Sequence, residues 1–295
     1  MTTFAPVPLA FALVTVVVYV LAVRRVRRGG ATWPRLRSWS FLGVGVPLFL
    51  AATCGPPAAR AHESLWAYVI MIVMLGMITP IFWVWGAPVS LGRAALPPRA
   101  ARLWAAWWDS HVVRVLTHPL ISPPLMLAVP VAVLATSLLL SSLQNAAVFA
   151  AVQIALLVVG VLATLPLSDT ESPPHRIPHA ASAFLAFFEL ILDAIPGIVL
   201  AYTTTLVAGG WYAVHGVPGG AEWAAGDQRA AGATLWVVGE LVDLPFMFLV
   251  IRRWMRADAE EARRIDAELD AQDDLRAAVE EALLPSDHHD ARPAP

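Results

Sequence analysis

Seven long apolar stretches dominate the chain and constrain its fold more than any other feature. They lie near residues 6–23, 39–55, 64–85, 119–141, 146–167, 182–208 and 231–251. A helix needs about 20 mostly apolar residues to cross the roughly 30 Å hydrocarbon core of a membrane. Charged residues make up only 14% of the chain, against about 25% in soluble domains. The sequence therefore predicts an all-α fold, a polytopic membrane helical bundle with about seven transmembrane helices.

The arginines predict how this bundle is oriented. Eleven of them fall in the loops after the first, third and fifth stretches, whereas the opposite loops hold only Arg60 and Arg229. Cytoplasmic loops are enriched in basic residues, so the N-terminus is predicted outside and the C-terminus in the cytoplasm. The first stretch is interpreted as a retained helix, because its arginines follow the apolar run, whereas those of a signal peptide precede it.

Charge also divides the chain into three predicted parts. Residues 1–251 form the seven-helix transmembrane domain. Twelve of the 22 acidic residues follow Ile251, and residues 252–284 are predicted to form a charged cytoplasmic helix, followed by a disordered tail at 285–295. The loop at 89–118 interleaves tryptophans with arginines. It is interpreted either as an amphipathic helix at the inner membrane interface or as an ordinary anchoring loop.

Missing residues exclude several functional classes. The chain has no lysine, so a retinal-type Schiff base cannot form, and Cys54 is the only cysteine, so a CxxC site is excluded. No nucleophile–base pair, phosphate loop or cofactor fingerprint is recognisable, which predicts that the protein is not an enzyme. Nothing in the sequence resembles the basic patch with interleaved aromatic residues that is typical of nucleic-acid binding, so no nucleic-acid partner is expected.

Four carboxyl groups in the last two apolar stretches give the strongest site signal. Glu189 and Asp193 are four residues apart, and Glu240 and Asp243 are three apart, so each pair shares one face of a helix. An ionisable side chain at membrane depth is a functional candidate by default. The pattern predicts a proton or metal site. The alternative is that neutral carboxyl groups join helices through hydrogen bonds.

Three methionines on the third stretch, Met71, Met74 and Met77, are spaced as a stripe on one helix. Thioethers are soft ligands that suit Cu(I), so these methionines join the four carboxyl groups as candidate metal ligands. Methionine is also an ordinary filler of apolar cores, and that alternative stays open.

The run from Pro80 to Pro88, which ends in Gly86-Ala87-Pro88, resembles the signature after the third helix of the CtaG family of caa3-type cytochrome c oxidase assembly factors. Further positions fit the same pattern: His118, Asp227, Gln228, Trp236, Gly239 and Glu240. The resemblance extends over the third to seventh stretches. Family members commonly carry histidines at positions where this chain has Tyr68, Ile72, Gln153 and Asp193.

This resemblance implies an integral membrane assembly factor for a haem–copper cytochrome c oxidase in the bacterial plasma membrane. Such a factor would deliver copper or hold a subunit during maturation, with membrane lipid and oxidase subunits as partners. No cofactor is assigned, and copper is the candidate metal. The alternative function is a proton or metal-cation transporter that uses the carboxylates buried in the sixth and seventh stretches.

Overall fold

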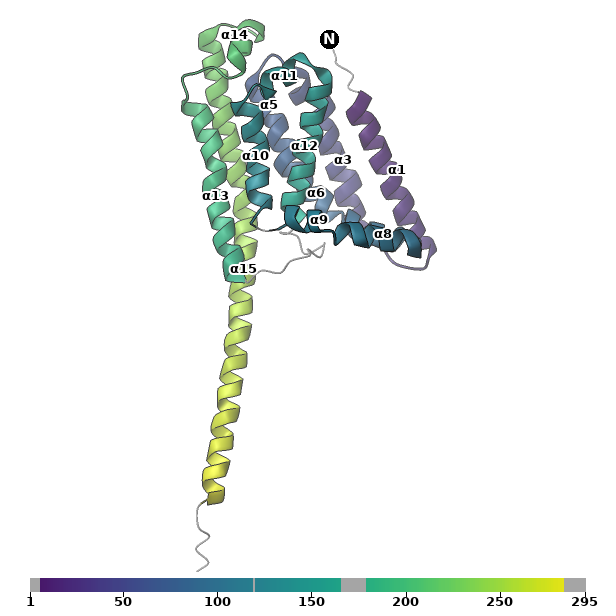
Figure 1. Cartoon of the computed structure of the whole chain (residues 1–295), viewed down its shortest axis with the longest axis vertical. Coiled ribbons are helices and arrows are strands. Elements are labelled where there is room, and N and C mark those ends of the chain that lie inside the picture. Colours follow the sequence, from purple (N-terminus) through teal and green to yellow (C-terminus); the bar gives the residue numbers. More distant parts are fainter. Residues whose placement is uncertain (1–5, 119, 166–178, 284–295) are drawn as a thin grey trace, which may run out of the picture. The chain divides into compact units, whose positions relative to one another are not determined.

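The computed structural model describes residues 6–118, 120–165 and 179–283, and the regular structure in these ranges is entirely helical (Figure 1). The prediction of an all-α fold is therefore confirmed for the described part of the chain. The chain divides into two compact units, Met1–Val250 and Ile251–Pro295. The tail predicted at 285–295 lies outside the described residues.

The first unit begins with segments that join into three long helices. They are α1 (Pro6–Arg28), α2 (Arg35–Ser38), η1 (Trp39–Gly45), α3 (Val46–Cys54), α4 (Pro56–Arg60), α5 (Leu65–Val73), η2 (Met74–Ile78) and α6 (Thr79–Trp85). The π-helical segments η1 and η2 each precede a proline, Pro47 or Pro80. A proline cannot donate a backbone hydrogen bond to the carbonyl four residues earlier, so the preceding turn can widen.

The second half of the chain adds shorter connecting helices and further long ones. They are α7 (Pro88–Ala95), α8 (Pro98–Trp108), α9 (His111–Leu116), α10 (Ser122–Ala135), α11 (Leu138–Gln144), α12 (Ala146–Thr164), α13 (His179–Tyr202), η4 (Ala208–Gly210), α14 (Trp211–His215) and α15 (Ala221–Leu283). Helix α15 runs through the boundary between the two units.

Four helices of the described residues are long and apolar enough to cross a membrane: Pro6–Arg28, Arg35–Arg60, Leu65–Ala95 and Ala146–Thr164. A fifth candidate is a bent pair, in which Pro124–Ala135 and Leu138–Gln144 meet at 68°. The bend follows from extended backbone at Thr136, whose hydroxyl accepts a hydrogen bond from the Leu138 amide at 3.1 Å. The stretch predicted near 119–141 is therefore not one straight helix.

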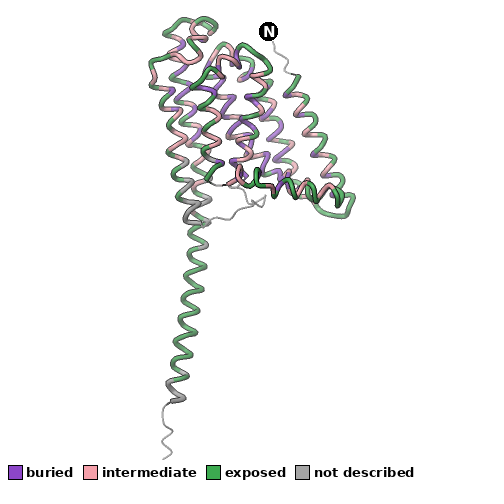
Figure 2. Tube along the Cα trace, viewed as in Figure 1, coloured by how far each residue is buried: buried purple, intermediate pink, exposed green. Residues whose placement is uncertain are grey.

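The third span lies at the centre of the first unit and the first span at its edge. In the most apolar 18-residue window of each helix, the buried share is 67% in Leu65–Ala95 but 22% in Pro6–Arg28. The burial colours show the same contrast (Figure 2). Helix α12 packs against η2 at two glycines, and a Cβ on Gly160 would lie 2.2 Å from the Gly76 carbonyl oxygen. Small residues at such crossings let membrane helices approach to backbone contact.

In the second unit, residues 251–283 form a solvated helix. Arg264 lies 3.5 Å from Glu261 and 3.8 Å from Glu268, and all three side chains are exposed. Pairs at this spacing stabilise an isolated helix by about 0.2–0.5 kcal/mol each, so they support the helix without requiring a packed core.

Candidate functional site

The crossing of α13 and α15 determines where the predicted carboxyl groups lie. A Cβ on Gly197 would lie 2.6 Å from the backbone nitrogen of Trp236 and 2.8 Å from the Gly232 carbonyl oxygen. The two backbones are therefore in direct contact, one turn beyond Asp193 along α13. Because the helices run antiparallel, this contact places Asp193 beside the part of α15 that carries Glu240 and Asp243.

The carboxyl groups of Asp193 and Asp243 form a hydrogen bond across the two helices. Glu240 lies one turn earlier on α15 and interacts electrostatically with Asp243. Glu189 is on α13, but its side chain lies outside the described residues. The contact between Asp193 and Asp243 joins two helices, which the spacing within each helix does not predict.

A cavity of about 30 Å³ lies next to Asp193. It is lined mainly by apolar side chains of η2, α10 and α12, with Gly76 and Gly160 at their crossing. Two sulfur-bearing side chains, Met77 and Met126, line the same cavity. Since one water needs about 10–15 Å³ of such volume, the cavity has room for one or two small ligands. Two methionines and one aspartate therefore line one small cavity.

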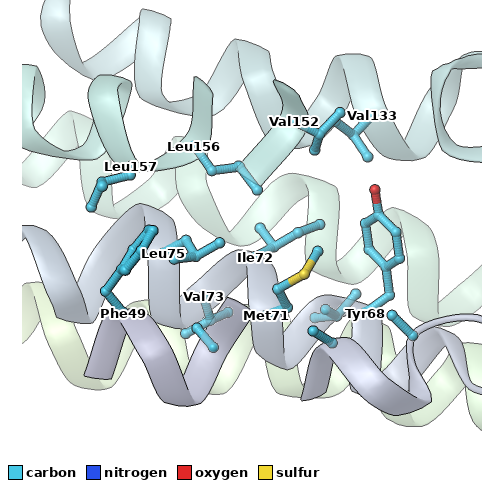
Figure 3. Packing of buried hydrophobic residues seen from close by; sticks show 14 of the residues in the cluster. Phe49, Tyr68, Met71, Ile72, Val73, Leu75, Val133, Val152, Leu156 and Leu157 are labelled. Atoms are coloured by element: carbon cyan, nitrogen blue, oxygen red, sulfur yellow. The ribbon is translucent and has the colours of Figure 1, made fainter. Parts of the chain in front are cut away.

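The predicted methionine stripe is divided between two environments. Met71 is fully buried, and its sulfur accepts a hydrogen bond from the Gln153 amide at 3.3 Å. Met74 and Met77 pack against the apolar core, but only Met77 of the three lines the cavity. Figure 3 shows Met71 among the buried residues of the third span, close to Ile72. Nothing in the sequence pattern singles out Met126, because it stands in a uniformly apolar helix.

Two positions where the family resemblance implies histidine carry polar groups that join helices. The hydroxyl of Tyr68 lies 2.8 Å from the Ser142 hydroxyl on α11, and Tyr68 is fully buried (Figure 3). Gln153 on α12 is 1% exposed and, among the described residues, its carbonyl oxygen has no hydrogen-bond partner. Within the described part of the chain, no three His, Cys, Asp or Glu side chains are placed to hold a metal ion.

Asp227 links α15 to the start of the third span. Its carboxylate accepts hydrogen bonds from the Ser64 hydroxyl at 2.8 Å, the Leu65 amide at 2.6 Å and the Trp66 amide at 3.3 Å. The first amides of a helix lack partners within the helix, and a negative charge there is favourable. The indole nitrogen of Trp66 also donates to Thr234 on α15 at 2.9 Å.

The neighbouring Gln228 holds the chain that leaves α13. This side chain is 3% exposed, accepts a hydrogen bond from the Val207 amide at 2.9 Å and donates to the Thr205 carbonyl at 3.1 Å. The two family-matched residues at 227 and 228 therefore fix the ends of two different helices against α15. Their role in the structure is to position helices.

Helix α14 closes the same end of the bundle. Tyr212 donates its hydroxyl to the Ala61 carbonyl at 2.9 Å, and burial raises the pKa of this phenol well above 10. Trp211 donates to the carbonyl of His62 at 3.0 Å. Partial burial lowers the pKa of the His62 imidazole, against the opposing effect of Glu63.

The Gly86-Ala87-Pro88 signature forms the sharp turn at the other end of the third span. Gly86 accepts a hydrogen bond from the Tyr19 hydroxyl at 2.8 Å, and a Cβ there would lie 2.6 Å from Cβ of Phe41. Ala87 has a left-handed backbone with φ of 51°, and Pro88 starts α7. The turn therefore locks α1 and η1 to the third span.

The remaining family-matched residues also have structural roles. Pro80 packs at the crossing with α12, since a Cβ on Gly160 would lie 2.6 Å from its ring. His118 accepts a hydrogen bond from the Leu120 amide at 3.2 Å, just before α10. A Cβ on Gly239 would lie 3.4 Å from the methyl group of Met77. This last contact places α15 beside η2, next to the cavity.

Comparison with known proteins gives one family match. The model of the cytochrome c oxidase caa3 assembly factor family matches residues 17–257. An uncharacterized protein of Mycobacterium leprae is 30% identical over 283 residues, which cover 91% of this chain and 42% of the relative. Uncharacterized proteins of Mycobacterium bovis and Mycobacterium tuberculosis are each 28% identical over 282 residues, again with 42% of their length covered. The chain thus spans less than half the length of these relatives. No solved structure matches it.

Proposed function

Because the chain belongs to the family of cytochrome c oxidase caa3 assembly factors, we propose that it assists the maturation of a haem–copper oxidase in the bacterial plasma membrane and is not itself an enzyme. This match confirms the family resemblance that the sequence from Pro80 to Pro88 indicates. The matched range, 17–257, takes in all but the first residues of the helical bundle and the crossing of α13 with α15. Oxidase subunits are therefore the proposed partners, with membrane lipid around the bundle.

The proposed topology has seven spans, with the N-terminus outside and the C-terminus in the cytoplasm. It adds α13 and the first part of α15 to the candidate spans, including the bent pair α10–α11. Support comes from the backbone contact of these two helices at Gly197 and Gly232 and from the placement of eleven arginines against two. Cysteine labelling at engineered positions in the loops after α1 and α4 tests the orientation, since only one of them should react from outside.

Copper is the proposed cargo, and the cavity beside Asp193 is its proposed binding place. The observation that carries this proposal is that Met77, Met126 and Asp193 line one small cavity. Thioether sulfur prefers Cu(I), and a carboxylate can balance the single positive charge of that ion in a medium that screens poorly. Met71 is a weaker candidate, because its sulfur already accepts a hydrogen bond from Gln153.

The test is the Cu(I) content of the detergent-purified protein under reducing conditions. A Met77→Leu/Met126→Leu variant should lose most of the bound copper, and Asp193→Asn should weaken binding. The matched control is Met71→Leu/Met74→Leu, which removes two methionines that lie on the same long helix as Met77 but do not line the cavity. Equal copper content in both methionine variants would refute the cavity site.

A second readout separates copper handling from the holding of a subunit. Cells that carry each variant are assayed for active oxidase, with Glu240→Gln alongside and the exposed Glu222→Gln as its control. Copper-free wild-type protein that still supports oxidase assembly would leave subunit holding as the function. Glu240→Gln should impair assembly more than Glu222→Gln, because only Glu240 interacts with the buried carboxyl pair.

A further inference from the structure

Helix α8 has one face that is anchored to the protein. Trp108 is 4% exposed and belongs to a small apolar cluster with Val84 and Val113. The indole of Trp104 donates to the Val89 carbonyl at 3.3 Å and lies over Gly92, where a Cβ would meet the ring at 3.1 Å. These contacts hold α8 against α7, roughly perpendicular to the long helices (Figure 1).

The opposite face of α8 combines exposed apolar and basic side chains. Leu103 is 74% exposed and Trp107 is 55% exposed, and Arg99 and Arg102 are exposed beside them. The spacing of three to four residues places these side chains on one side of the helix. Leucine and tryptophan next to arginine is the composition of helices that lie at a membrane surface, with apolar groups in the acyl boundary and basic groups at the headgroups.

This end of the first unit is strongly basic. Residues 24–38 and 89–118 hold ten arginines and one acid, Asp109. Asp109 lies 3.9 Å from Arg93, and its backbone carbonyl accepts a hydrogen bond from Arg114 at 3.1 Å. In the described ranges, neither Arg99 nor Arg102 forms an ion pair with a protein side chain. Their charges are therefore available to an external anion.

The exposed end of α1 and the segment after it extend the same surface. Helix α1 packs against α7 and ends in four exposed arginines, from Arg24 to Arg28. Leu36 and Trp39 are 75% and 63% exposed. The apolar and basic side chains thus alternate around this end of the bundle. The charge complementarity favours an anionic surface over a neutral one.

We propose that the exposed face of α8 is a binding site for anionic phospholipid, in which Arg99 and Arg102 bind the phosphate and Leu103 and Trp107 enter the acyl region. Guanidinium groups match phosphate oxygens with paired hydrogen bonds, which favours arginine over a point charge at such a site. The proposal does not depend on copper binding, because no residue of the cavity is part of it.

The experiment is native mass spectrometry of the full chain in detergent, titrated with phosphatidylglycerol or phosphatidylcholine. The wild type should retain phosphatidylglycerol in preference. Arg99→Gln/Arg102→Gln should weaken this binding about thirtyfold, since each basic residue near an anionic lipid surface contributes roughly a factor of five. The matched control is Arg60→Gln/Arg229→Gln, which removes two arginines predicted on the opposite membrane side and should leave binding unchanged.

Further arms test the chemistry of the ligand. Leu103→Ser/Trp107→Ser should weaken phosphatidylglycerol binding while leaving an unchanged helical spectrum and elution volume, which shows that the bundle remains folded. Inorganic phosphate at the same concentration should not displace the lipid. Equal binding of the two lipids, equal loss in both arginine variants, or tighter binding of a polyglutamate peptide than of phosphatidylglycerol would overturn the proposal.

Discussion

Replacing Asp227 with alanine should remove the strongest polar link between α15 and the third span. The carboxylate accepts three hydrogen bonds, two of them from the first amides of α5 and one from Ser64. Hydrogen bonds to a charged group contribute about 1.5–3 kcal/mol each, and the partial exposure of this site reduces that value. We therefore expect Asp227→Ala to lower the free energy of unfolding by about 3 kcal/mol. Asp227→Asn keeps one acceptor oxygen and should lose about 1 kcal/mol.

The assay is reversible unfolding of the purified protein in mixed micelles with increasing dodecyl sulfate, followed by circular dichroism. Glu222→Gln is the control, because Glu222 is an exposed acid in the first turn of the same helix. A double-mutant cycle with Ser64→Ala should give a coupling energy of about 1 kcal/mol, since the two side chains touch. The reasoning is refuted if Asp227→Ala and Glu222→Gln agree within about 0.5 kcal/mol, the usual range for surface substitutions.

Three further predictions concern packing, a buried amide and pH. Gly160→Ala should destabilise the bundle by about 1–3 kcal/mol through overpacking, because the new Cβ would lie 2.2 Å from the Gly76 carbonyl oxygen. Gly226→Ala is the control in the same unfolding assay, because the nearest atom there is 4.0 Å away. Gln153→Leu should leave stability unchanged or raise it by about 1 kcal/mol, because it removes a buried carbonyl oxygen without a partner among the described residues. A clear loss of stability in the same assay would contradict this and show that the hydrogen bond from the amide to Met71 outweighs the unpaired oxygen. Burial holds the pKa of His62 in the folded protein below its ordinary value of 6.5. As the pH drops through 6.5, the imidazole is protonated in the unfolded chain before it is protonated in the folded one, so the free energy of unfolding should fall. A pH series of unfolding curves should show a smaller fall in His62→Gln.

The apolar stretches predict much of the fold because membrane depth restricts the choices. Every backbone group in hydrocarbon needs an internal partner, so long apolar runs without strand signals indicate helices. The bend between α10 and α11 is harder to predict, since it depends on Thr136, whose hydroxyl accepts a hydrogen bond from the Leu138 amide after the break. A polar residue in an apolar run is also compatible with a straight helix. Hydropathy alone does not distinguish these cases.

The carboxyl groups illustrate the limit of helical spacing. The spacing of Glu240 and Asp243 places them on one face of a helix, but the partner of Asp243 is Asp193 on another helix. That pairing depends on the register of α13 against α15, which Gly197 and Gly232 determine by allowing backbone contact. Met126 is a similar case, because its nearness to Met77 and Asp193 follows from packing and not from any sequence interval.

Two positions where the family resemblance implies histidine explain why the proposed copper site lies deeper along the third span. Tyr68 directs its hydroxyl to Ser142, and Gln153 directs its amide to Met71, so both side chains join helices instead of facing an open site. Met77 stands six residues beyond Met71, about 9 Å along the helix at 1.5 Å per residue. At that level the bundle supplies a cavity, two thioethers and a carboxyl group that already contacts a second one. A Cu(I) ion held there would lie beside Asp193, whose carboxylate can balance its single positive charge. The Cu(I) content of the purified protein should therefore fall more in Asp193→Asn than in Met71→Leu, because Asp193 lines the cavity and Met71 does not.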